Sequence, residues 1–468
     1  MKKLTTLLIA ILALFLTSAA TFNRQNVNNQ RLFEHALRER AWVDSVFNSM
    51  NEDERLGQLI WLRAHVDKDT DYEATVEHLI KKYHAGGICF FNPSHEGTPE
   101  KQVELTNRYQ AAAGKVPLFV SIDGEWGLGM RLRETALSFP RQLLLGAVKN
   151  DQLIYRMGAE IARHCKRIGV NVNFAPVADV NNNPNNPVIG FRSFGEDRHR
   201  VAAKAWNYMK GLQDNGVLAS AKHFPGHGDT DVDSHYDLPV VNHTRQRLDS
   251  VELFPFKILI EQGVGSVMVA HLQVPALDPA PKTPTTLSRP VVTDLLRNEL
   301  NFNGLILTDG LEMKGVTKHH APGEVEALAL AAGVDGLLLP SDVDASVKTI
   351  KAWLNVPAAS AAEPDVPNPA ATKVAGTKGR LDRNSLHESV KRVLRWKYRL
   401  GITRFEPVSI ENIREDLNDN QARSVKRLLI ENALTLVRNE GNLLPFGAPG
   451  QGSGQGLRNL EGFVNLGD

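Results

Sequence analysis

Short apolar runs recur along the chain, separated by amphipathic or turn-rich segments. Near-continuous apolar runs that alternate with helical periodicity are typical of strands in a parallel sheet. The clearest helical pattern covers Asp151–Ile168 and ends before Gly169, a residue type that favours helix C-termini. We predict eight strands: Gln58–Leu62, Gly87–Phe91, Leu118–Asp123, Val170–Val177, Val217–Lys222, Ser266–His271, Leu305–Asp309 and Gly336–Pro340.

This alternation predicts the α/β fold class, and eight strands over roughly 300 residues predict a (β/α)8 TIM-type barrel. Polar residues follow six of the apolar runs: Asp123, Asp179, Lys222, His271, Asp309 and Asp342. In a parallel barrel such positions face one mouth, where active sites are built. For any one acidic residue taken alone, a helix cap or a turn former is the favoured interpretation, but six polar residues at strand ends together favour a shared mouth.

The chain divides into three predicted parts. Residues 1–20 have the pattern of a signal peptide, because Lys2 and Lys3 precede the apolar run Leu7–Leu16 and the small residues of Thr17–Ala20. Export to the periplasm or the extracellular space follows, with no membrane insertion after cleavage. An uncleaved membrane anchor is the alternative.

The barrel is predicted over residues 42–400, interrupted by a linker or insertion rich in Ala, Pro and Gly at Val356–Arg380. Residues 401–468 read as a connector with an amphipathic helix around Asp419–Glu431, and the residues at its end are too few to form another complete domain. Asn51 and Glu54 have the spacing of a capping box that opens the first helix after the signal region.

Composition narrows the function classes. The 54 Lys and Arg residues nearly balance the 53 Asp and Glu residues, which gives a formal net charge of +1. This balance gives the chain no excess of positive charge of the kind that binds nucleic acid. Cys89 and Cys165 both lie in apolar patterns, so we expect two buried thiols and no disulfide.

The segment Lys222–His235 (KHFPGHGDTDVDSH) is the richest in candidate chemistry. Asp233 lies two residues from His235, close enough for the carboxylate to accept an imidazole N–H and make the ring a workable acid and base. His227 and Asp229 have the same spacing, and spacing alone does not choose between the two pairs.

The aspartates and histidines of this segment also raise the alternatives of a calcium site and a zinc site. A calcium loop that starts at Asp229 would need Gly at position 234 and Glu at position 240, where the chain has Ser234 and Val240. A zinc site built from His223, His227 and His235 lacks a recognised spacing.

Three further segments fit glycoside chemistry. Asp309 directly follows an apolar strand, where its carboxylate can serve as the nucleophile of a double displacement. The loop Ser121–Leu132 places Asp123, Glu125 and Trp126 among glycines, as groups that can hold a sugar. The long polar loop in Asn173–Asp197 adds the guanidinium of Arg192.

Together these segments, from about residue 42 to 444, resemble glycoside hydrolase family 3, and within it the bacterial β-N-acetylglucosaminidases of the NagZ type. The resemblance implies that Asp309 is the nucleophile, His235 the general acid/base and Asp233 its orienting partner. It assigns sugar binding to a second group of residues: Asp123, Arg192, Lys222 and His223. It also implies that Thr435–Phe446 is the opening of a second α/β domain, of which residues 401–468 hold the connector and the truncated start. We expect no cofactor and no metal. The DGEWG sequence at 123–127 departs from the usual acidic-Gly-Gly form and leaves the roles of Glu125 and Trp126 open.

The expected function is therefore a retaining exo-β-N-acetylglucosaminidase that releases terminal GlcNAc from peptidoglycan-derived sugars, with muropeptides or other GlcNAc-containing glycans as its partners. A family 3 β-glucosidase, or a phosphorylase that uses the same covalent intermediate, is the nearest alternative. A substrate-assisted hexosaminidase would dispense with the enzyme nucleophile. A sugar-binding barrel without catalysis is an alternative of another class, and the presence of both Asp309 and the Asp233–His235 pair counts against it.

Overall fold

The computed structural model describes residues 33–92, 94, 97–234, 236–318, 320–356 and 379–439. The predicted signal segment 1–20, His235 and nearly all of the predicted linker Val356–Arg380 lie outside the described residues. None of the helices within the described ranges has the length and apolar character that crossing a membrane requires.

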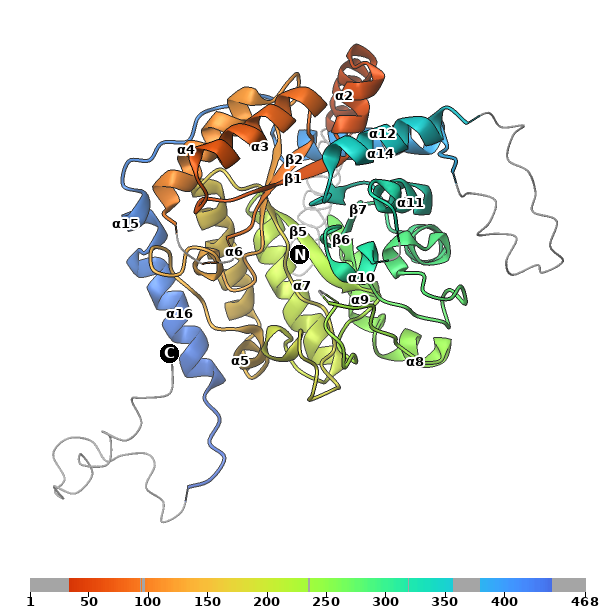
Figure 1. Cartoon of the computed structure of the whole chain (residues 1–468). Coiled ribbons are helices and arrows are strands. Elements are labelled where there is room, and N and C mark those ends of the chain that lie inside the picture. Colours follow the sequence, from red (N-terminus) through yellow and green to blue (C-terminus); the bar gives the residue numbers. More distant parts are fainter. Residues whose placement is uncertain are drawn as a thin grey trace, which may run out of the picture.

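The predicted (β/α)8 barrel is confirmed, with eight parallel strands in the order β7-β6-β5-β4-β3-β2-β1-β8 (Figure 1). A parallel bridge between Leu307 and Gly336 joins β7 to β8 and closes the ring. The strands are β1 (Ile60–Ala64), β2 (Gly87–Phe90), β3 (Phe119–Ile122), β4 (Val172–Asn173), β5 (Leu218–Phe224), β6 (Ser266–Val269), β7 (Leu305–Thr308) and β8 (Leu337–Leu338).

Every predicted strand overlaps an observed one, but β4 is much shorter than the predicted Val170–Val177. The backbone turns back at Ala175, whose N–H donates to the Asn173 carbonyl oxygen. Pro176 then has no N–H to offer the ladder. Beyond the strand, the Ala175 carbonyl oxygen still accepts 2.9 Å from Ser220 N–H of β5, and an isolated bridge follows between Val177 and Lys222.

Helices surround the barrel (Figure 1). Those of the barrel are α2 (Glu52–Gly57), α3 (Thr70–Tyr83), α4 (Pro99–Ala112), α5 (Gln142–Gly146), α6 (Gln152–Arg167), α7 (Arg198–Asp214), α8 (Arg245–Ser250), α9 (Phe254–Glu261), η4 (Pro290–Glu299), α10 (Lys314–Thr317), α11 (Glu324–Ala332), α12 (Val343–Leu354) and α14 (Arg383–Arg399). Short helical turns occur at η1 (Leu128–Met130), η2 (Gly190–Arg192) and η3 (Thr285–Leu287).

The predicted helix signals are confirmed at two sites. Asn51 and Glu54 form the capping box of α2, with reciprocal backbone-to-side-chain hydrogen bonds of 2.9 and 2.8 Å. The predicted helix Asp151–Ile168 is α6, and the side chains that form its apolar stripe are fully buried: Ile154, Met157, Ile161 and Cys165. Cys89 and Cys165 are both free and buried, as expected.

The chain after α14 wraps back along the outside of the barrel, where α15 (Ile413–Leu417) and α16 (Asn420–Ala433) pack against α6 (Figure 1). Helix α16 confirms the predicted amphipathic helix. Arg167 fastens this connector by donating 2.7 Å to Asp416, and Arg163 donates 2.6 Å to Asp419. The residues after 439, which include most of the predicted opening of the second domain at Thr435–Phe446, lie outside the described residues.

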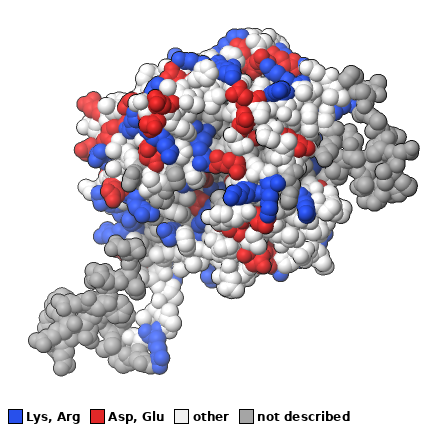
Figure 2. All heavy atoms as spheres, in the orientation of Figure 1, with Lys and Arg blue, Asp and Glu red and all other residues white. Residues whose placement is uncertain are grey.

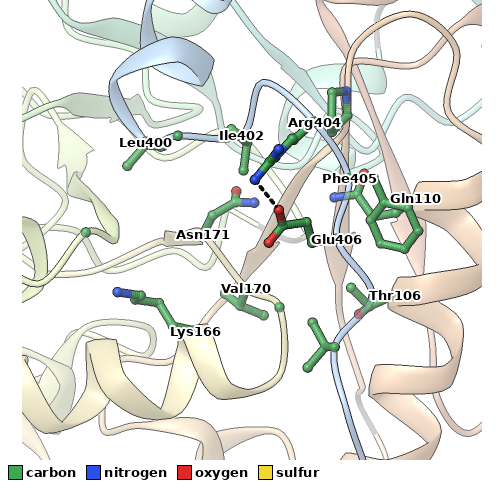
Figure 3. Close-up of a pocket in the computed structure, with 15 residues that line it drawn as sticks. Thr106, Gln110, Lys166, Val170, Asn171, Leu400, Ile402, Arg404, Phe405 and Glu406 are labelled. Carbon is green, nitrogen blue, oxygen red and sulfur yellow. Dashed lines mark ion pairs between the residues drawn. The ribbon is translucent and has the colours of Figure 1, made fainter.

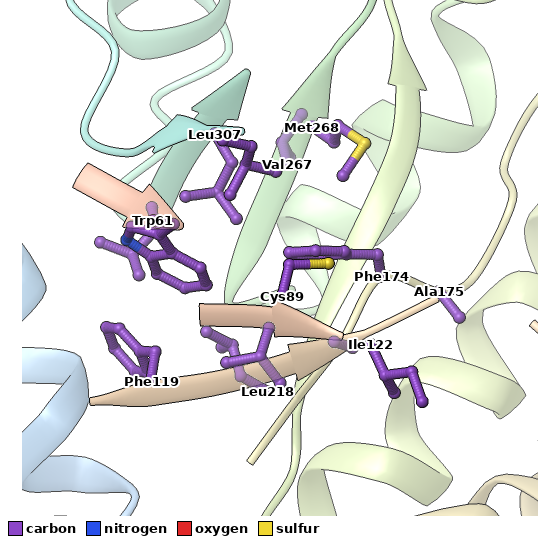
Figure 4. Close-up of a cluster of buried hydrophobic side chains, with 14 of the residues drawn as sticks. Trp61, Cys89, Phe119, Ile122, Phe174, Ala175, Leu218, Val267, Met268 and Leu307 are labelled. Atoms are coloured by element: carbon purple, nitrogen blue, oxygen red, sulfur yellow. The ribbon is translucent and has the colours of Figure 1, made fainter. Parts of the chain in front are cut away.

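The barrel interior is a packed apolar core, in which Trp61 of β1 stacks on Phe119 of β3 with ring centroids 4.8 Å apart (Figure 4). One charged group is buried beside it. Lys397 of α14 is fully buried, and its Nζ donates 2.7 Å to Gln58 Oε1. Burial lowers the pKa of Lys397 to about 7. Outside the core, acidic and basic side chains intermingle on the face shown in Figure 2.

Candidate active site

The carboxyl ends of β3 and β5 meet at the barrel mouth and form an ion pair. Asp123 directly follows β3, and Lys222 lies near the end of β5. The Lys222 Nζ donates 2.7 Å to Asp123 Oδ1 and lies 2.8 Å from Glu125 Oε1. Burial alone would raise the pKa of Asp123, but the positive charges of Lys222 and Arg131 outweigh it and lower that pKa. Both partners are therefore charged at neutral pH.

Arg192, in the turn η2 after β4, extends this network. Its guanidinium donates to both carboxylate oxygens of Glu125, at 2.6 and 3.0 Å, in the bidentate geometry that arginine favours. The Glu125 side chain is fully buried. Burial would raise the pKa of Glu125, yet the charges of Arg192 and Lys222 hold it well below its usual value. Glu125, which the sequence left without a role, is thus an anchor of the site.

Arg131 is a member of the network that the sequence analysis did not single out. Its Nη2 donates 2.9 Å to Asp123 Oδ2, so Lys222 and Arg131 hold the two oxygens of one carboxylate. The Arg131 guanidinium also lies 4.2 Å from the centroid of the Phe91 ring. The only sequence signal was its place in the glycine-rich loop after β3, where an arginine has no obvious partner until the fold is known.

Asp179 is a second residue that the sequence analysis placed at a strand end without giving it a role. Its buried carboxylate accepts from His223 Nδ1 at 2.7 Å and from the backbone N–H of His227 at 2.7 Å. Arg192 Nη2 lies 3.3 Å from His223 Nε2. The His223 ring therefore lies between the Asp179 carboxylate and the Arg192 guanidinium. This arrangement fixes the orientation of the His223 ring in the mouth.

The alternative pairing of His227 with Asp229 is wrong. His227 is buried, with its ring nitrogens 2.8 Å from Thr230 Oγ1 and 3.0 Å from Ser234 Oγ. Asp229 instead lies 2.7 Å from His243 Nε2. Burial, with the nearby His223, lowers the pKa of His227 to about 4, so this ring is neutral at pH 7. A neutral, enclosed imidazole is poorly suited to donate a proton to a leaving group.

Asp309 directly follows β7, on the same rim as Lys222. Its Oδ1 accepts 2.8 Å from the N–H of Gly310, and the side chain is half-buried. Burial would raise the pKa of Asp309, but the neighbouring His223 and His271 lower it to about 2. At neutral pH this carboxylate is ionised, as a nucleophile must be.

The remaining predicted residues fall as follows. Asp233 lies on the loop between β5 and α8, where its carbonyl oxygen accepts from the N–H groups of Tyr236 and Asp237 at 3.0 and 3.2 Å. His235, next to it, lies outside the described residues. Asp342 caps α12 by accepting 2.9 Å from Ala345 N–H, which is the turn-and-cap alternative considered for strand-end aspartates.

The zinc arrangement of His223, His227 and His235 finds no support in its described members, because the nitrogens of His223 and His227 already face protein partners. Another group within the described chain brings ligand-type atoms within 4.8 Å of one another: Asp229, His243 and Glu252. Arg247 Nη2 lies 3.1 Å from Glu252 Oε1 and supplies a positive charge there. This group anchors the loop after β5.

A comparison with protein-family profiles decides the identity of this barrel. The profile of the glycosyl hydrolase family 3 N-terminal domain matches residues 52–395. The chain belongs to glycosyl hydrolase family 3.

Among the relatives of this family 3 chain is a protein named β-hexosaminidase A from Pseudoalteromonas piscicida, 34% identical over 385 residues. That match covers 78% of this chain and 61% of the relative. A protein from Cellulomonas fimi, named β-N-acetylglucosaminidase/β-glucosidase, is 28% identical over 86% of this chain and 68% of its own length. The family 3 chain therefore spans about two thirds of these relatives.

A solved structure of a family 3 β-N-acetylglucosaminidase from Paenibacillus sp. str. FPU-7 superposes with a TM-score of 0.72 at 34% identity. The match covers 84% of this chain and 70% of that structure. A β-glucoside phosphorylase also superposes, with a TM-score of 0.72, but at 24% identity this likeness concerns the fold alone.

The mouth is distinct from two hollows that the described residues of the family 3 barrel line. One has a volume of about 450 Å³ and lies among α4, the segments that lead into β4 and β5, and the connector at 400–408 (Figure 3). Because these segments enter their strands there, this hollow opens on the side opposite the mouth. The other, of about 400 Å³, lies between η4, α11 and α14.

Proposed function

We propose that this chain is a retaining exo-β-N-acetylglucosaminidase. The observation that carries the proposal is the ionised carboxylate of Asp309, which lies on the same rim of the barrel as Lys222, the cation that pairs with Asp123 and Glu125. The hexosaminidase and β-N-acetylglucosaminidase names of several relatives support the choice of sugar.

In the first step, Asp309 attacks the anomeric carbon of the terminal sugar. The bond from that carbon to the leaving oxygen breaks, and a bond to an Asp309 carboxylate oxygen forms. The proton required by the leaving oxygen comes from His235, whose imidazole Asp233 orients. In the second step, water gives a proton to His235 and attacks the same carbon, which releases the sugar with retained configuration and restores Asp309.

In this proposal, the ion network of Asp123, Lys222 and Arg192 binds the sugar. Asp123 presents acceptor oxygens, while Lys222 and Arg192 present donors, at positions fixed by contacts of 2.6 to 3.0 Å to their partners. His223 completes the group with its orientation set by Asp179. Because the ions hold one another in place, little reorganisation is needed when the hydroxyl groups of a sugar arrive.

We further propose export and a role in the turnover of peptidoglycan-derived sugars. Support comes from Lys2, Lys3 and the apolar run Leu7–Leu16, and from bacterial relatives with hexosaminidase names. Sequencing the N-terminus of protein recovered from the periplasm or the medium tests export. A start within or just after Thr17–Ala20 supports it, whereas an intact N-terminus in the cell pellet contradicts it.

The test of function is release of p-nitrophenol from the β-N-acetylglucosaminide and from the β-glucoside, with and without phosphate. Preferential turnover of the GlcNAc substrate that is independent of phosphate is the expected result. Formation of a sugar 1-phosphate would instead identify a phosphorylase, and preference for glucose a β-glucosidase. Sugar binding without turnover of either substrate would indicate a non-catalytic barrel.

A further inference from the structure

A cluster of two aromatic rings and one cation borders the network of the mouth. We call Trp126, Arg141 and Phe191 the rim cluster. Trp126 directly follows Glu125, and Phe191 directly precedes Arg192. Since Glu125 and Arg192 form the bidentate ion pair, the backbones that carry the two rings are joined through it.

Arg141 connects the two rings. Its guanidinium carbon lies 4.1 Å from the Phe191 ring centroid and 5.2 Å from that of Trp126. Across the described part of the chain, its guanidinium contacts rings but makes no hydrogen bond or ion pair. The Arg141 guanidinium therefore places a positive charge, and N–H groups that donate no hydrogen bond within the described residues, at the edge of the mouth.

The backbone around the rim cluster is held firmly. The Trp126 carbonyl oxygen accepts 2.9 Å from Phe139 N–H, and the Glu125 carbonyl oxygen accepts 2.8 Å from Gln142 Nε2. These two contacts bracket Arg141 in the sequence and fix its place opposite the rings. Such preorganisation lowers the entropy lost when a ligand is held.

The rim cluster is also exposed where a ligand can reach it. Phe191 is 47% exposed, and the neighbouring Leu143 and Leu144 on α5 are 51% and 41% exposed. Exposed apolar groups gathered beside a polar site indicate an interaction surface. A ring face packs on the C–H face of a sugar, and a free guanidinium pairs with a carboxylate.

We propose that the rim cluster binds the sugar unit on the leaving-group side of the scissile bond, and that it favours a unit carrying a carboxylate. This inference rests on the proposed function. We assign a sugar unit to the rim cluster because each ring belongs to a residue next in sequence to a charged residue of the ion network: Trp126 follows Glu125, and Phe191 precedes Arg192. The charge of Arg141 selects the acidic sugar over a neutral one.

The experiment compares two disaccharides that both end in β-linked GlcNAc. In one the second unit is GlcNAc, and in the other it is N-acetylmuramic acid, whose lactyl group is a carboxylate. In R141Q, kcat/KM for the acidic disaccharide should fall about five- to tenfold, with less than about twofold change for the neutral one. R40Q is the matched control, because Arg40 is 83% exposed on the helix over residues 33–49.

Phe191→Ala tests the stacking part, with Phe33→Ala as control because Phe33 is 66% exposed on that other helix. We expect F191A to lower kcat/KM for both disaccharides about tenfold, and F33A to change neither. Equal losses on the two substrates in R141Q would overturn the carboxylate assignment. Unchanged kinetics in both rim variants, or a change of oligomeric state in F191A, would overturn the subsite.

A failure of the rim cluster assignment can be distinguished from a failure of the proposed function. Turnover of the p-nitrophenyl β-N-acetylglucosaminide by the wild type tests the chemistry without the second sugar. If the wild type hydrolyses no GlcNAc glycoside, the proposed function fails. If it hydrolyses them while the rim variants match their controls, only the rim cluster assignment fails.

Discussion

At the scale of single residues, the mouth works through carboxylates kept ionised by neighbouring cations. Burial normally favours the neutral form of a carboxyl group. Here the opposing charges win at Asp123, Glu125 and Asp309, whose pKa values all lie below their usual range. None of these three groups is therefore suited to act as the proton donor, which agrees with the role proposed for His235.

The first prediction concerns the nucleophile. Asp309→Ala should lower turnover of β-GlcNAc glycosides by at least about 10⁴-fold, because the covalent intermediate is lost. In the wild type a fluorinated β-GlcNAc-type inactivator should label Asp309, as mapped by peptide mass spectrometry. Asp294→Ala, at an exposed carboxylate on η4, should keep normal activity. Labelling at another residue contradicts the assignment.

The second prediction separates the two histidines. His235→Ala should slow substrates with poor leaving groups by ~10²–10⁴-fold, while activated aryl glycosides suffer much less. Asp233→Ala should show a milder form of the same pattern. His227→Ala should instead lower stability without any dependence on the leaving group, because it removes the contacts to Thr230 and Ser234. A leaving-group effect in H227A would reverse the choice.

The site was only partly predictable from sequence, for a physical reason. Asp309, Lys222 and Asp123 stand at strand ends, which apolar runs reveal locally. The role of Asp179 and the partner of Asp229 depend on contacts between residues 44 and 14 positions apart, respectively. Equal spacing made His227–Asp229 look equivalent to Asp233–His235, although the fold turns His227 toward Thr230 and Ser234.

At the scale of elements, the loop after β5 is positioned by close backbone packing as well as by side chains. A Cβ atom placed on Gly228 would lie 1.9 Å from the carbonyl oxygen of Val180 in the loop after β4. The two loops therefore approach one another only because position 228 has no side chain. The buried contacts of His227 and the pair of Asp229 with His243 hold the same loop.

The third prediction follows from that approach. Gly228→Ala should cost about 1–3 kcal/mol of unfolding free energy through overpacking, and should lower kcat by displacing the loop. Gly114→Ala is the control, since its nearest neighbour outside the local chain would be His84 Nδ1 at 3.4 Å. Denaturant unfolding and steady-state kinetics measure both effects. Equal stability of the two variants would show that the loops separate freely.

Among the elements, sequence predicted strand existence better than strand length. Apolar runs marked all eight strands because a buried parallel strand is apolar on both faces. The early end of β4 depends on a local backbone turn at Ala175, and hydrophobicity at Val177 carries no sign of it. Helix α6 was predicted nearly to the residue, since its buried stripe and the glycine that ends it are both local signals.

At the scale of the whole molecule, the side of the barrel away from the mouth contains a buried lysine, Lys397. Lys397 of α14 is buried beside Phe119 with Gln58 as its hydrogen-bond acceptor. Its pKa of about 7 in the folded chain lies below its ordinary value of 10.5. Between these two pH values the unfolded chain binds a proton that the folded chain does not.

The fourth prediction is therefore a stability that rises with pH. From about pH 7 toward pH 10, Lys397 should contribute up to about 1.4 kcal/mol of unfolding free energy per pH unit, because the unfolded state binds more protons. The measurement is the difference between wild type and Lys397→Met across this range in denaturant unfolding. The wild type should gain relative to the variant as pH rises, and a difference independent of pH would contradict the burial argument.

The network in the mouth, followed from end to end, is a row of five charges that alternate in sign: Arg131, Asp123, Lys222, Glu125 and Arg192. Each interior member separates two like charges, so its neutralisation leaves those neighbours repelling one another. Glu125→Gln, for example, would leave Lys222 and Arg192 without the carboxylate between them. We therefore expect the five residues to tolerate substitution only together: a change of charge at one position needs a compensating change at its neighbour.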